Sequence, residues 1–225
     1  MPTIYVIAGP NGIGKTTSSF DILPSGIPVI NSDEIAKEAR AAGIIVANTQ
    51  EYSNQEAARL VDEQIGKRNT FAIETNLSDV ETWKFLIKVQ ELGYELHVKY
   101  YSTDQLQVLN DRIAIRVRLG DHFVRPDIVE QRYISGLKLL DHYFHYPDVL
   151  ELFDNTDSMV LVGEFKRGEI VMRLEVMPAW VVKYLGNHLR PRLDSSVPAK
   201  DLSDIDAVRK AYQALKDASR PKADR

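Results

Sequence analysis

Cysteine is absent from the 225 residues of this chain. Its absence excludes disulfide bonds, zinc sites built on thiolates and a cysteine nucleophile. Long apolar runs are lacking as well, because no stretch approaches the roughly 20 residues that span a bilayer. The N-terminal residues have the pattern of a buried strand rather than that of a signal peptide. We therefore expect a cytoplasmic protein in a reducing compartment, without a membrane partner.

The chain also lacks an excess of basic residues. Its formal net charge of −4 gives no general reason to expect nucleic-acid binding, since such proteins usually need a basic face. From Lys183 onward, ten Lys/Arg and six Asp/Glu give a local balance of +4, which leaves −8 on the preceding part. With 44% hydrophobic residues the chain can bury a full core. We predict one domain over residues 1–187, then a linker, an appended helix and a frayed basic tail over residues 188–225.

What the sequence does contain is a phosphate-binding loop of the Walker A pattern. Residues 9–16 read GPNGIGKT and directly follow the apolar run TIYVIA. The glycines let the backbone turn tightly and aim its N–H groups at a multiply charged anion. Lys15 would reach the outer phosphates of a nucleotide, and Thr16 would offer its hydroxyl to Mg²⁺. The predicted ATP-binding residues are Gly9, Pro10, Asn11, Gly12, Ile13, Gly14, Lys15, Thr16, Thr17 and Asn155.

Strand and helix signals alternate along most of the chain, which predicts a parallel sheet with crossover helices. Strands are expected at residues 3–8, 27–31, 70–75, 94–102 and 149–153, and an antiparallel hairpin at 158–165 and 169–176. Two capping-box patterns, Ser53 with Glu56 and Ser78 with Glu81, predict helix starts. The break GDHFVRPD at 120–127 separates two helices, the second starting at Pro126. The predicted fold is an α/β three-layer sandwich with a mainly parallel five-stranded sheet, an arginine-bearing helical lid, and a C-terminal hairpin plus helix.

Polar residues at the carboxyl ends of the predicted strands are the site candidates, because ligands of open parallel sheets bind there. Asp33 is the predicted general base for an acceptor hydroxyl, with a helix cap as the alternative. Glu74 closes an apolar strand and needs a metal, a cation or a substrate hydroxyl as partner, with a structural ion pair as the alternative. The predicted substrate-binding residues are Asn31, Glu74, Thr75 and Asn76, and the predicted Mg²⁺ ligands are Thr16 and Glu74. The same rule selects Ser102, Asp104 and Asp154.

Arginines gather around the GDHFVRPD break. They are Arg112, Arg116, Arg118, Arg125 and Arg132. Guanidinium groups delivered by such a segment would stabilise the charge of a transferring phosphoryl group. For any single arginine, a solvated surface charge is the alternative. The predicted catalytic residues are Lys15, Asp33, Arg116, Arg118 and Arg125. His142 and His145, with Asp141 beside them, are more typical of a helix surface than of a metal site.

Five segments together resemble the zeta-toxin-like P-loop kinases over about residues 1–165. They read AGPNGIGKTT, NSDEIAKEA, AIETNLS, RIAIRVRLGDHFVRPDIVEQRY and, later, DNT. The resemblance implies a P-loop kinase fold, transfer of phosphate from ATP with Mg²⁺ to the sugar of UDP-N-acetylglucosamine, and an antitoxin protein that covers the ATP site. By position it implies Lys15 and Thr16 at the ATP phosphates and Mg²⁺, Asp33 as base, Glu74 and Thr75 near the acceptor, and Arg116 in the lid.

Two departures from the family pattern leave the acceptor open. Gly120, Asp121 and His122 stand where relatives tend to have Gly-Gly-His, and Ser135 stands where a further arginine is expected. The γ-phosphate clamp could therefore use Arg118, Arg125 or Arg132 instead. We predict an ATP-dependent small-molecule kinase with a nucleotide sugar as the leading acceptor. The alternatives are another metabolite acceptor, or a nucleotide-dependent ATPase or switch that acts through a protein partner.

Overall fold

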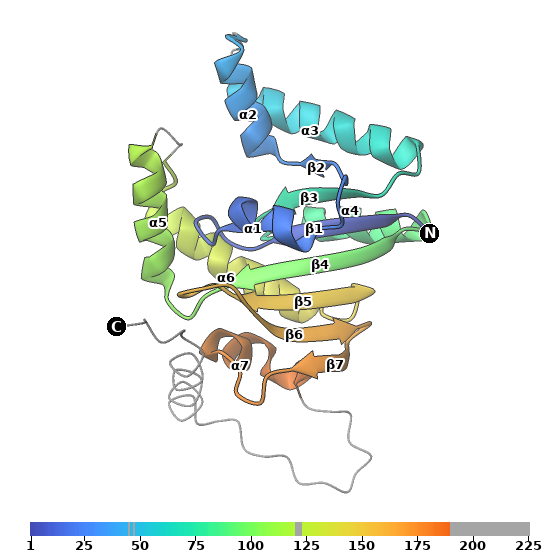
Figure 1. Cartoon of the computed structure of the whole chain (residues 1–225), viewed down its shortest axis with the longest axis vertical. Coiled ribbons are helices and arrows are strands. Elements are labelled where there is room, and N and C mark those ends of the chain that lie inside the picture. The colour runs from blue at the N-terminus through green and yellow to red at the C-terminus, as the bar shows by residue number, and fades with distance from the viewer. Residues whose placement is uncertain (45, 47, 120–122, 190–225) are drawn as a thin grey trace, which may run out of the picture.

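The computed structural model describes residues 1–44, 46, 48–119 and 123–189, which build one β-sheet flanked by helices (Figure 1). The strands are β1 (Thr3–Ala8), β2 (Val29–Ile30), β3 (Phe71–Thr75), β4 (Glu95–Ser102), β5 (Val149–Asp154), β6 (Val160–Lys166) and β7 (Glu169–Arg173). The helices are α1 (Lys15–Ile22), α2 (Ser32–Ala41), α3 (Thr49–Gly66), α4 (Val80–Glu91), α5 (Leu106–Arg118), α6 (Pro126–His142) and α7 (Ala179–Leu185). A short 3₁₀ turn, η1, covers Gly186–His188.

The strand order β2-β3-β1-β4-β5-β6-β7 confirms the predicted α/β class. The first five strands are parallel, and β6 and β7 are antiparallel to their neighbours. The sheet has seven strands rather than five because the predicted hairpin continues it at the β5 edge. Arg167 and Gly168 join β6 to β7 with φ angles of 48° and 79°, and two positive φ values suit the twist of a tight hairpin. Ala8 pairs with Thr75 on one side and with Tyr100 on the other, so β1, β3 and β4 end at the same edge.

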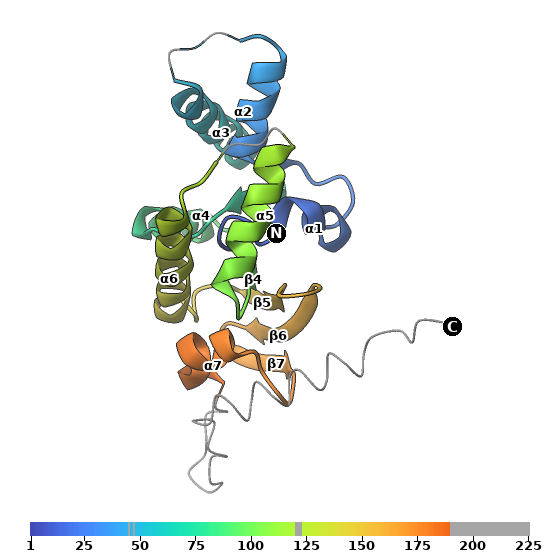
Figure 2. The ribbon, with the colours of Figure 1, turned by 90° about the vertical axis from the view of Figure 1, so that its left-hand side faces the viewer.

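Figure 2 shows the sheet between two helical layers, with α4, α6 and α7 on one face and α1 on the other. The larger core lies under the first layer, where Trp83 of α4, Leu137 of α6 and Trp180 of α7 are buried. A smaller core on the opposite face includes Ile13 and Leu109. Each large apolar side chain buried in this way contributes about 1.5–3 kcal/mol. Helices α2 and α3 pack on each other beyond β2, at the top of Figure 1.

Both capping-box predictions misplaced the cap, by five residues for α3 and by one residue for α4. Helix α3 starts at Thr49, and the side chain of Asn48 accepts hydrogen bonds from the N–H groups of Gln50 and Glu51. Ser53 is buried inside the helix, where its hydroxyl donates to the Gln50 carbonyl at 3.0 Å. Helix α4 is capped by Asp79, whose carboxylate accepts from the Thr82 N–H at 2.8 Å. In each case an Asn or Asp near the predicted Ser made the cap, because its side chain is at least as good an acceptor.

The C-terminal part contains a helix that the sequence did not predict. Helix α7 begins after Pro178 and has seven residues, too few for a clear helical period. Trp180, Val181 and Leu185 are buried in the larger core, and Val182 and Tyr184 are partly buried against it. Residues 120–122 and those from 190 onward lie outside the described part of the chain. They include the predicted turn at Gly120, Asp121 and His122, and the region for which an appended helix and a basic tail are predicted. Across the described part of the chain, every helix is too short or too polar to cross a membrane.

Candidate active site

The phosphate-binding loop connects β1 to α1 at the carboxyl edge of the sheet. Gly9, Gly12 and Gly14 have φ angles of 139°, 79° and 94°, which L side chains rarely adopt. A Cβ atom on Gly9 would lie 2.3 Å from the Tyr101 carbonyl oxygen, and one on Gly12 would lie 2.5 Å from the Leu109 carbonyl oxygen. Both the conformation of the loop and its close packing therefore require glycine.

Lys15 is buried in this loop, with 8% of its surface exposed. Its Nζ donates to the Gly9 carbonyl at 2.7 Å and to the Pro10 carbonyl at 3.2 Å, and it lies 3.4 Å from the Asn76 Oδ1. Burial lowers the pKa of Lys15 to about 8, although the carboxylates of Glu74 and Asp33 act in the opposite direction. The ammonium group is thus held at the base of the loop, within electrostatic range of both acidic candidates.

Thr16 and Glu74 form a second pair at the loop. The Thr16 hydroxyl lies 3.1 and 3.0 Å from the two carboxylate oxygens of Glu74. Burial raises the pKa of Glu74, and the charge of Lys15 and the Thr16 hydrogen bond partly offset the effect. A hydroxyl and a partly buried carboxylate are hard oxygen ligands of the kind that Mg²⁺ prefers. The two residues therefore fit the predicted Mg²⁺ site.

Asp33 lies in the first turn of α2 and is not its cap. The cap is Asn31, whose side-chain oxygen accepts from the Asp33 N–H at 2.9 Å. The alternative reading of Asp33 as the helix cap was therefore wrong. With its backbone fixed by Asn31, Asp33 lines the same cavity as Lys15 and Glu74.

The predicted lid arginines take up different positions. Arg132 of α6 donates from Nη1 to the Asn11 side chain in the phosphate loop at 2.8 Å. Arg116 of α5 lines the cavity, and its charge helps to lower the pKa of both Lys15 and Glu74. Arg125 is at the exposed rim, where its Nε donates to the Asp127 carboxylate at 3.0 Å.

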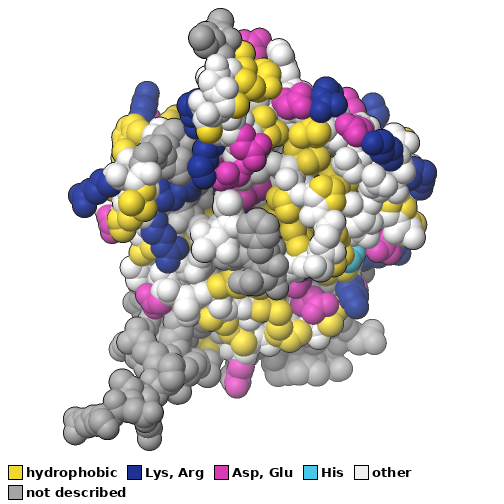
Figure 3. Space-filling model, turned by 45° about the horizontal axis from the view of Figure 1, so that its top comes forward, with side chains coloured by type: hydrophobic (Ala, Val, Ile, Leu, Met, Phe, Trp, Pro, Cys, Tyr) yellow, Lys and Arg dark blue, Asp and Glu magenta, His cyan; other side chains and the backbone are white. Residues whose placement is uncertain are grey.

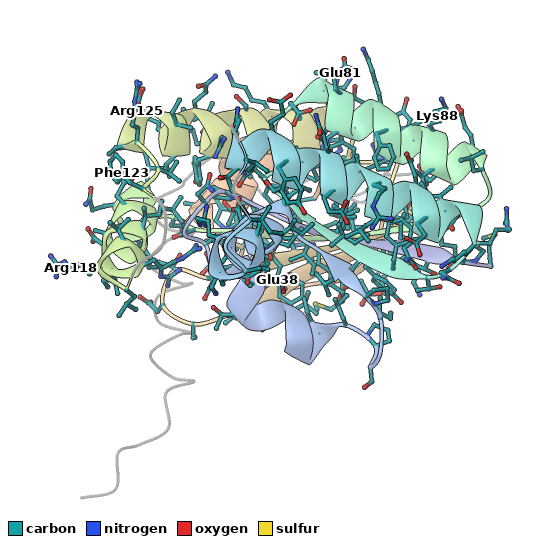
Figure 4. The ribbon with its side chains drawn as sticks, turned by 90° about the horizontal axis from the view of Figure 1, so that it is seen from above. Glu38, Glu81, Lys88, Arg118, Phe123 and Arg125 are labelled. Carbon is teal, nitrogen blue, oxygen red and sulfur yellow. The ribbon has the colours of Figure 1, made fainter. Side chains whose placement is uncertain are left out.

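Arg118 is separated from the other arginines. It is exposed, it is not part of the cavity wall, and it points away from the rest of the molecule (Figure 4). The reason is helical geometry, because two residues along α5 turn the side chain about 200° away from Arg116. The structure thus brings Arg116, Arg125 and Arg132 to the cavity and leaves Arg118 on the outer surface.

Arg112 and Asn155 are tied to each other and to the phosphate loop. Arg112 donates from Nη1 to the Asn155 carbonyl at 2.8 Å and from Nη2 to the Thr156 carbonyl at 3.1 Å. The side-chain amide of Asn155 donates to the Ile13 carbonyl at 2.6 Å. The segment after β5 is therefore fixed to both α5 and the loop.

Three other candidates at the strand ends lie outside the cavity wall. Asp104 accepts from the Trp180 N–H at 2.8 Å, at the start of α7. Asp154 accepts from the Trp180 Nε1 at 3.2 Å and from the Thr156 hydroxyl at 2.9 Å. Ser102 is completely buried. Asp104 and Asp154 hold α7 on the sheet, a helix that was not expected from the sequence.

The cavity has a volume of about 1240 Å³ and lies between α2, α3 and the ends of α5 and α6. Among the described residues, six basic and three acidic side chains line it, a formal balance of +3 in a chain of −4. They are Lys15, Lys37, Arg112, Arg116, Arg125, Arg132, Asp33, Glu34 and Glu74. Figure 3 shows basic side chains gathered at the left of the view, with acidic side chains beside them toward the centre. Thr17, Thr75 and Asn76 also line the cavity, whereas Gly9, Pro10 and Ile13 are buried and are not part of its wall.

Sequence reasoning missed the cavity wall formed by α3. Gln50 and Asn54 lie one turn apart in this helix and line the cavity. The predicted start of the helix at Ser53 left Gln50 outside it, so the pair could not be recognised as one face. Recognition of Asn48 as the cap would have revealed them. Apolar residues at the mouth were missed as well, namely Ile115, Phe123, Val124, Ile128 and Met159.

The histidines near the end of α6 form a packed cluster. His188 of η1 is hydrogen-bonded to Asp141 at 2.8 Å and stacks on Phe144 with ring centroids 4.1 Å apart. His145 lies against Gly168 in the hairpin turn, and His142 contacts the ring of Tyr143. Within the described ranges, the acidic and histidine side chains form no group of three that could hold a metal ion.

Comparison with known proteins identifies a relative in sequence and several in structure. No protein-family model matches the chain. An uncharacterized protein of Haemophilus influenzae is 31% identical over 126 residues, which are 56% of this chain and 88% of that protein. The complex of AvrRxo1-ORF1 and -ORF2 with ATP matches 95% of this chain and 76% of its own, with a TM-score of 0.62 and 14% identity. The PezAT chromosomal toxin–antitoxin system of Streptococcus pneumoniae matches 98% of this chain and 88% of its own, with a TM-score of 0.55 and 14% identity.

Proposed function

Because the chain belongs to the same family as the Haemophilus influenzae protein and has the fold of the zeta-toxin-like P-loop kinases, we propose that it is an ATP-dependent kinase. It transfers the γ-phosphate of ATP to a hydroxyl group of a small molecule. The observation that carries the proposal is the convergence of Lys15, the Thr16–Glu74 pair and Asp33 on one cavity. These are the parts that phosphoryl transfer needs: an anion cradle, a metal site and a proton acceptor.

In this proposal the chain itself positions both substrates. The loop N–H groups and Lys15 hold the triphosphate, and Arg116 and Arg132 neutralise charge on the γ-phosphate as it moves. Thr16 and Glu74 would hold Mg²⁺, which supplies further neutralisation of the phosphate charge. Asp33 takes the proton from the acceptor hydroxyl while the hydroxyl oxygen bonds to the γ-phosphorus. The bond between the γ-phosphorus and the oxygen that bridges it to the β-phosphate breaks, and ADP leaves.

The acceptor that we propose is a nucleotide sugar such as UDP-N-acetylglucosamine. The cavity volume of about 1240 Å³ exceeds the roughly 300–1,000 Å³ of ordinary small-molecule sites, so it has room for a second ligand. Its surplus of basic side chains favours an acceptor that brings phosphates of its own. Gln50 and Asn54 add amide groups on the α2–α3 side, which suit hydroxyl and amide groups of a sugar.

We further propose a protein partner that acts like an antitoxin on this site. Two structural relatives, AvrRxo1-ORF1:-ORF2 and the PezAT system, are complexes or toxin–antitoxin pairs, which supports this proposal. The exposed apolar side chains at the cavity mouth, Ile115 and Phe123, would give such a partner an apolar contact.

The test of the proposed function is the destination of the γ-phosphate. Incubation of the chain with γ-labelled ATP, Mg²⁺ and UDP-N-acetylglucosamine, or with a metabolite extract, should give a labelled small molecule that mass spectrometry identifies. A label found only in inorganic phosphate would replace the kinase by an ATPase or switch. A label on another molecule would keep the kinase and replace the acceptor.

Asp33→Asn tests the proton acceptor. The variant should lose about 10²–10⁴-fold in kcat, because the acceptor hydroxyl keeps its proton, while ATP binding measured by calorimetry stays near that of the wild type. Glu38→Gln makes the same change of carboxylate to amide on the exposed side of the same helix and should leave transfer unchanged. Undiminished transfer by Asp33→Asn would remove Asp33 from the mechanism.

A further inference from the structure

We propose that Asn155 is a positioning residue that aims the phosphate loop, and that Arg112 and Trp180 hold Asn155 in place. The inference rests on the proposed function, because it concerns how the loop is held ready for ATP. It gives the segment after β5 and the unpredicted helix α7 a role in nucleotide binding.

The first step is the contact between Asn155 and the loop. The Asn155 amide donates to the Ile13 carbonyl at 2.6 Å, and the Ile13 side chain is fully buried in the smaller core. In a planar trans peptide the carbonyl and the following N–H point in opposite directions. When Asn155 holds the Ile13 carbonyl, it therefore turns the Gly14 N–H to the opposite side. Gly14 lines the cavity, so the orientation of this peptide affects how the loop meets an anion.

The close packing of Asn155 on Gly14 leaves little room for another arrangement. A Cβ atom added to Gly14 would lie 2.9 Å from the Asn155 Nδ2. Gly14 also has a φ of 94°, which glycine adopts easily because it has no Cβ. The chain thus places a residue with a flexible backbone next to the Asn155 side chain, which fixes its conformation. Asn155 thus limits the freedom that the loop glycines introduce.

Hydrogen bonds from three neighbouring elements hold the backbone around Asn155. Its N–H donates to the Ser102 carbonyl at 2.9 Å, and its own carbonyl accepts from Arg112 at 2.8 Å. The preceding residue, Asp154, accepts from the Trp180 Nε1 at 3.2 Å. The backbone on both sides of Asn155 is therefore fixed by β4, α5 and α7 together. Loss of the Trp180 hydrogen bond should therefore loosen Asp154 and Asn155 and, with them, the Ile13 carbonyl in the phosphate loop.

The test measures Mg²⁺–ATP dissociation constants by calorimetry and transfer kinetics for folded variants. Asn155→Ala should weaken ATP binding about tenfold, as expected for loss of one short hydrogen bond. Asn155→Asp should weaken it further, because a carboxylate would face the Ile13 carbonyl. For both variants kcat at saturating ATP should change less than the dissociation constant, since the reacting groups stay in place.

Trp180→Phe and Trp83→Phe form a matched pair that tests how Asn155 is held. Both tryptophans are buried, but only Trp180 has a hydrogen-bond partner for its Nε1, whereas the Trp83 Nε1 has none. Trp180→Phe should weaken ATP binding about two- to fivefold, and Trp83→Phe should leave it unchanged. This pair also tests the proposal if an Asn155 variant fails to fold.

The outcomes separate this inference from the proposed function. If the wild-type chain binds no Mg²⁺–ATP, the proposed function fails. If the wild type binds and folded Asn155→Ala and Trp180→Phe bind equally well, the inference is overturned while the kinase stands. Equal losses in Trp180→Phe and Trp83→Phe would overturn the link through Asp154, because they would reflect core packing alone.

Discussion

The charge of Lys15 should make the nucleotide affinity of the free protein depend on pH. Burial lowers the pKa of this ammonium to about 8, so Lys15 is mostly charged at pH 7 and mostly neutral at pH 9. A neutral amine gives the triphosphate no charge to pair with. Raising the pH through 8 therefore removes the positive charge of the lysine in the cradle.

The size of the effect follows from the fraction of Lys15 that carries a proton. With a pKa of about 8 this fraction falls from roughly 0.9 at pH 7 to just under 0.1 at pH 9, so kcat/KM for ATP should fall about tenfold. The value of kcat should fall much less, because the bound triphosphate favours the charged amine and raises its pKa. The fall in kcat/KM occurs as the pH rises, because Lys15 loses its proton and its charge above its lowered pKa.

The assay is initial-rate kinetics at saturating acceptor between pH 7 and pH 9.5. Lys15→Arg is the control, because the guanidinium group stays charged throughout this range. Its kcat/KM should be lower than that of the wild type at pH 7 but flat as the pH rises. A wild-type kcat/KM that is constant up to pH 9.5 would refute the reasoning, and so would an equal decline in Lys15→Arg.

Two further predictions concern the loop and the lid. Gly12→Ala and Gly26→Ala both place a side chain at a φ near 80°, which costs about 1–2 kcal/mol. Only Gly12→Ala also pushes a Cβ onto the Leu109 carbonyl. Denaturant unfolding should therefore show a larger loss in the free energy of unfolding for Gly12→Ala than for Gly26→Ala. Calorimetry should show loss of ATP binding for Gly12→Ala alone. Arg132→Ala should lower kcat about 10²-fold, whereas Arg118→Ala, on the outer side of α5, should stay within about twofold in the same assay.

The sheet and the phosphate loop could be predicted from the sequence because their signals are local. Apolar runs such as residues 3–8 and 71–75 form strands because successive residues on both faces of the sheet are buried in most of each run, and glycines at fixed spacing dictate the loop. The cluster of polar residues at the strand ends follows from parallel pairing, which brings Thr75 and Tyr100 beside Ala8.

The remaining features depend on contacts that no local pattern contains. Asp104 and Asp154 have the sequence context of site residues, yet they bind Trp180, which is far away along the chain. Ser53 has a capping-box spacing, but Asn48 is a competing cap five residues earlier. Arg118 shares its segment with Arg116, and only the helical rotation between them decides which one faces the cavity.

The position of β1 has a consequence for biosynthesis. It is the central strand of the parallel region, yet its partners begin only at Phe71 and Glu95, far beyond it along the chain. This apolar segment is synthesised before either partner and must wait for β3 or β4 before it can pair, and such waiting exposes it to aggregation. Asn155 emerges later still, so a nascent chain gains its complete nucleotide cradle only after β5 has been synthesised.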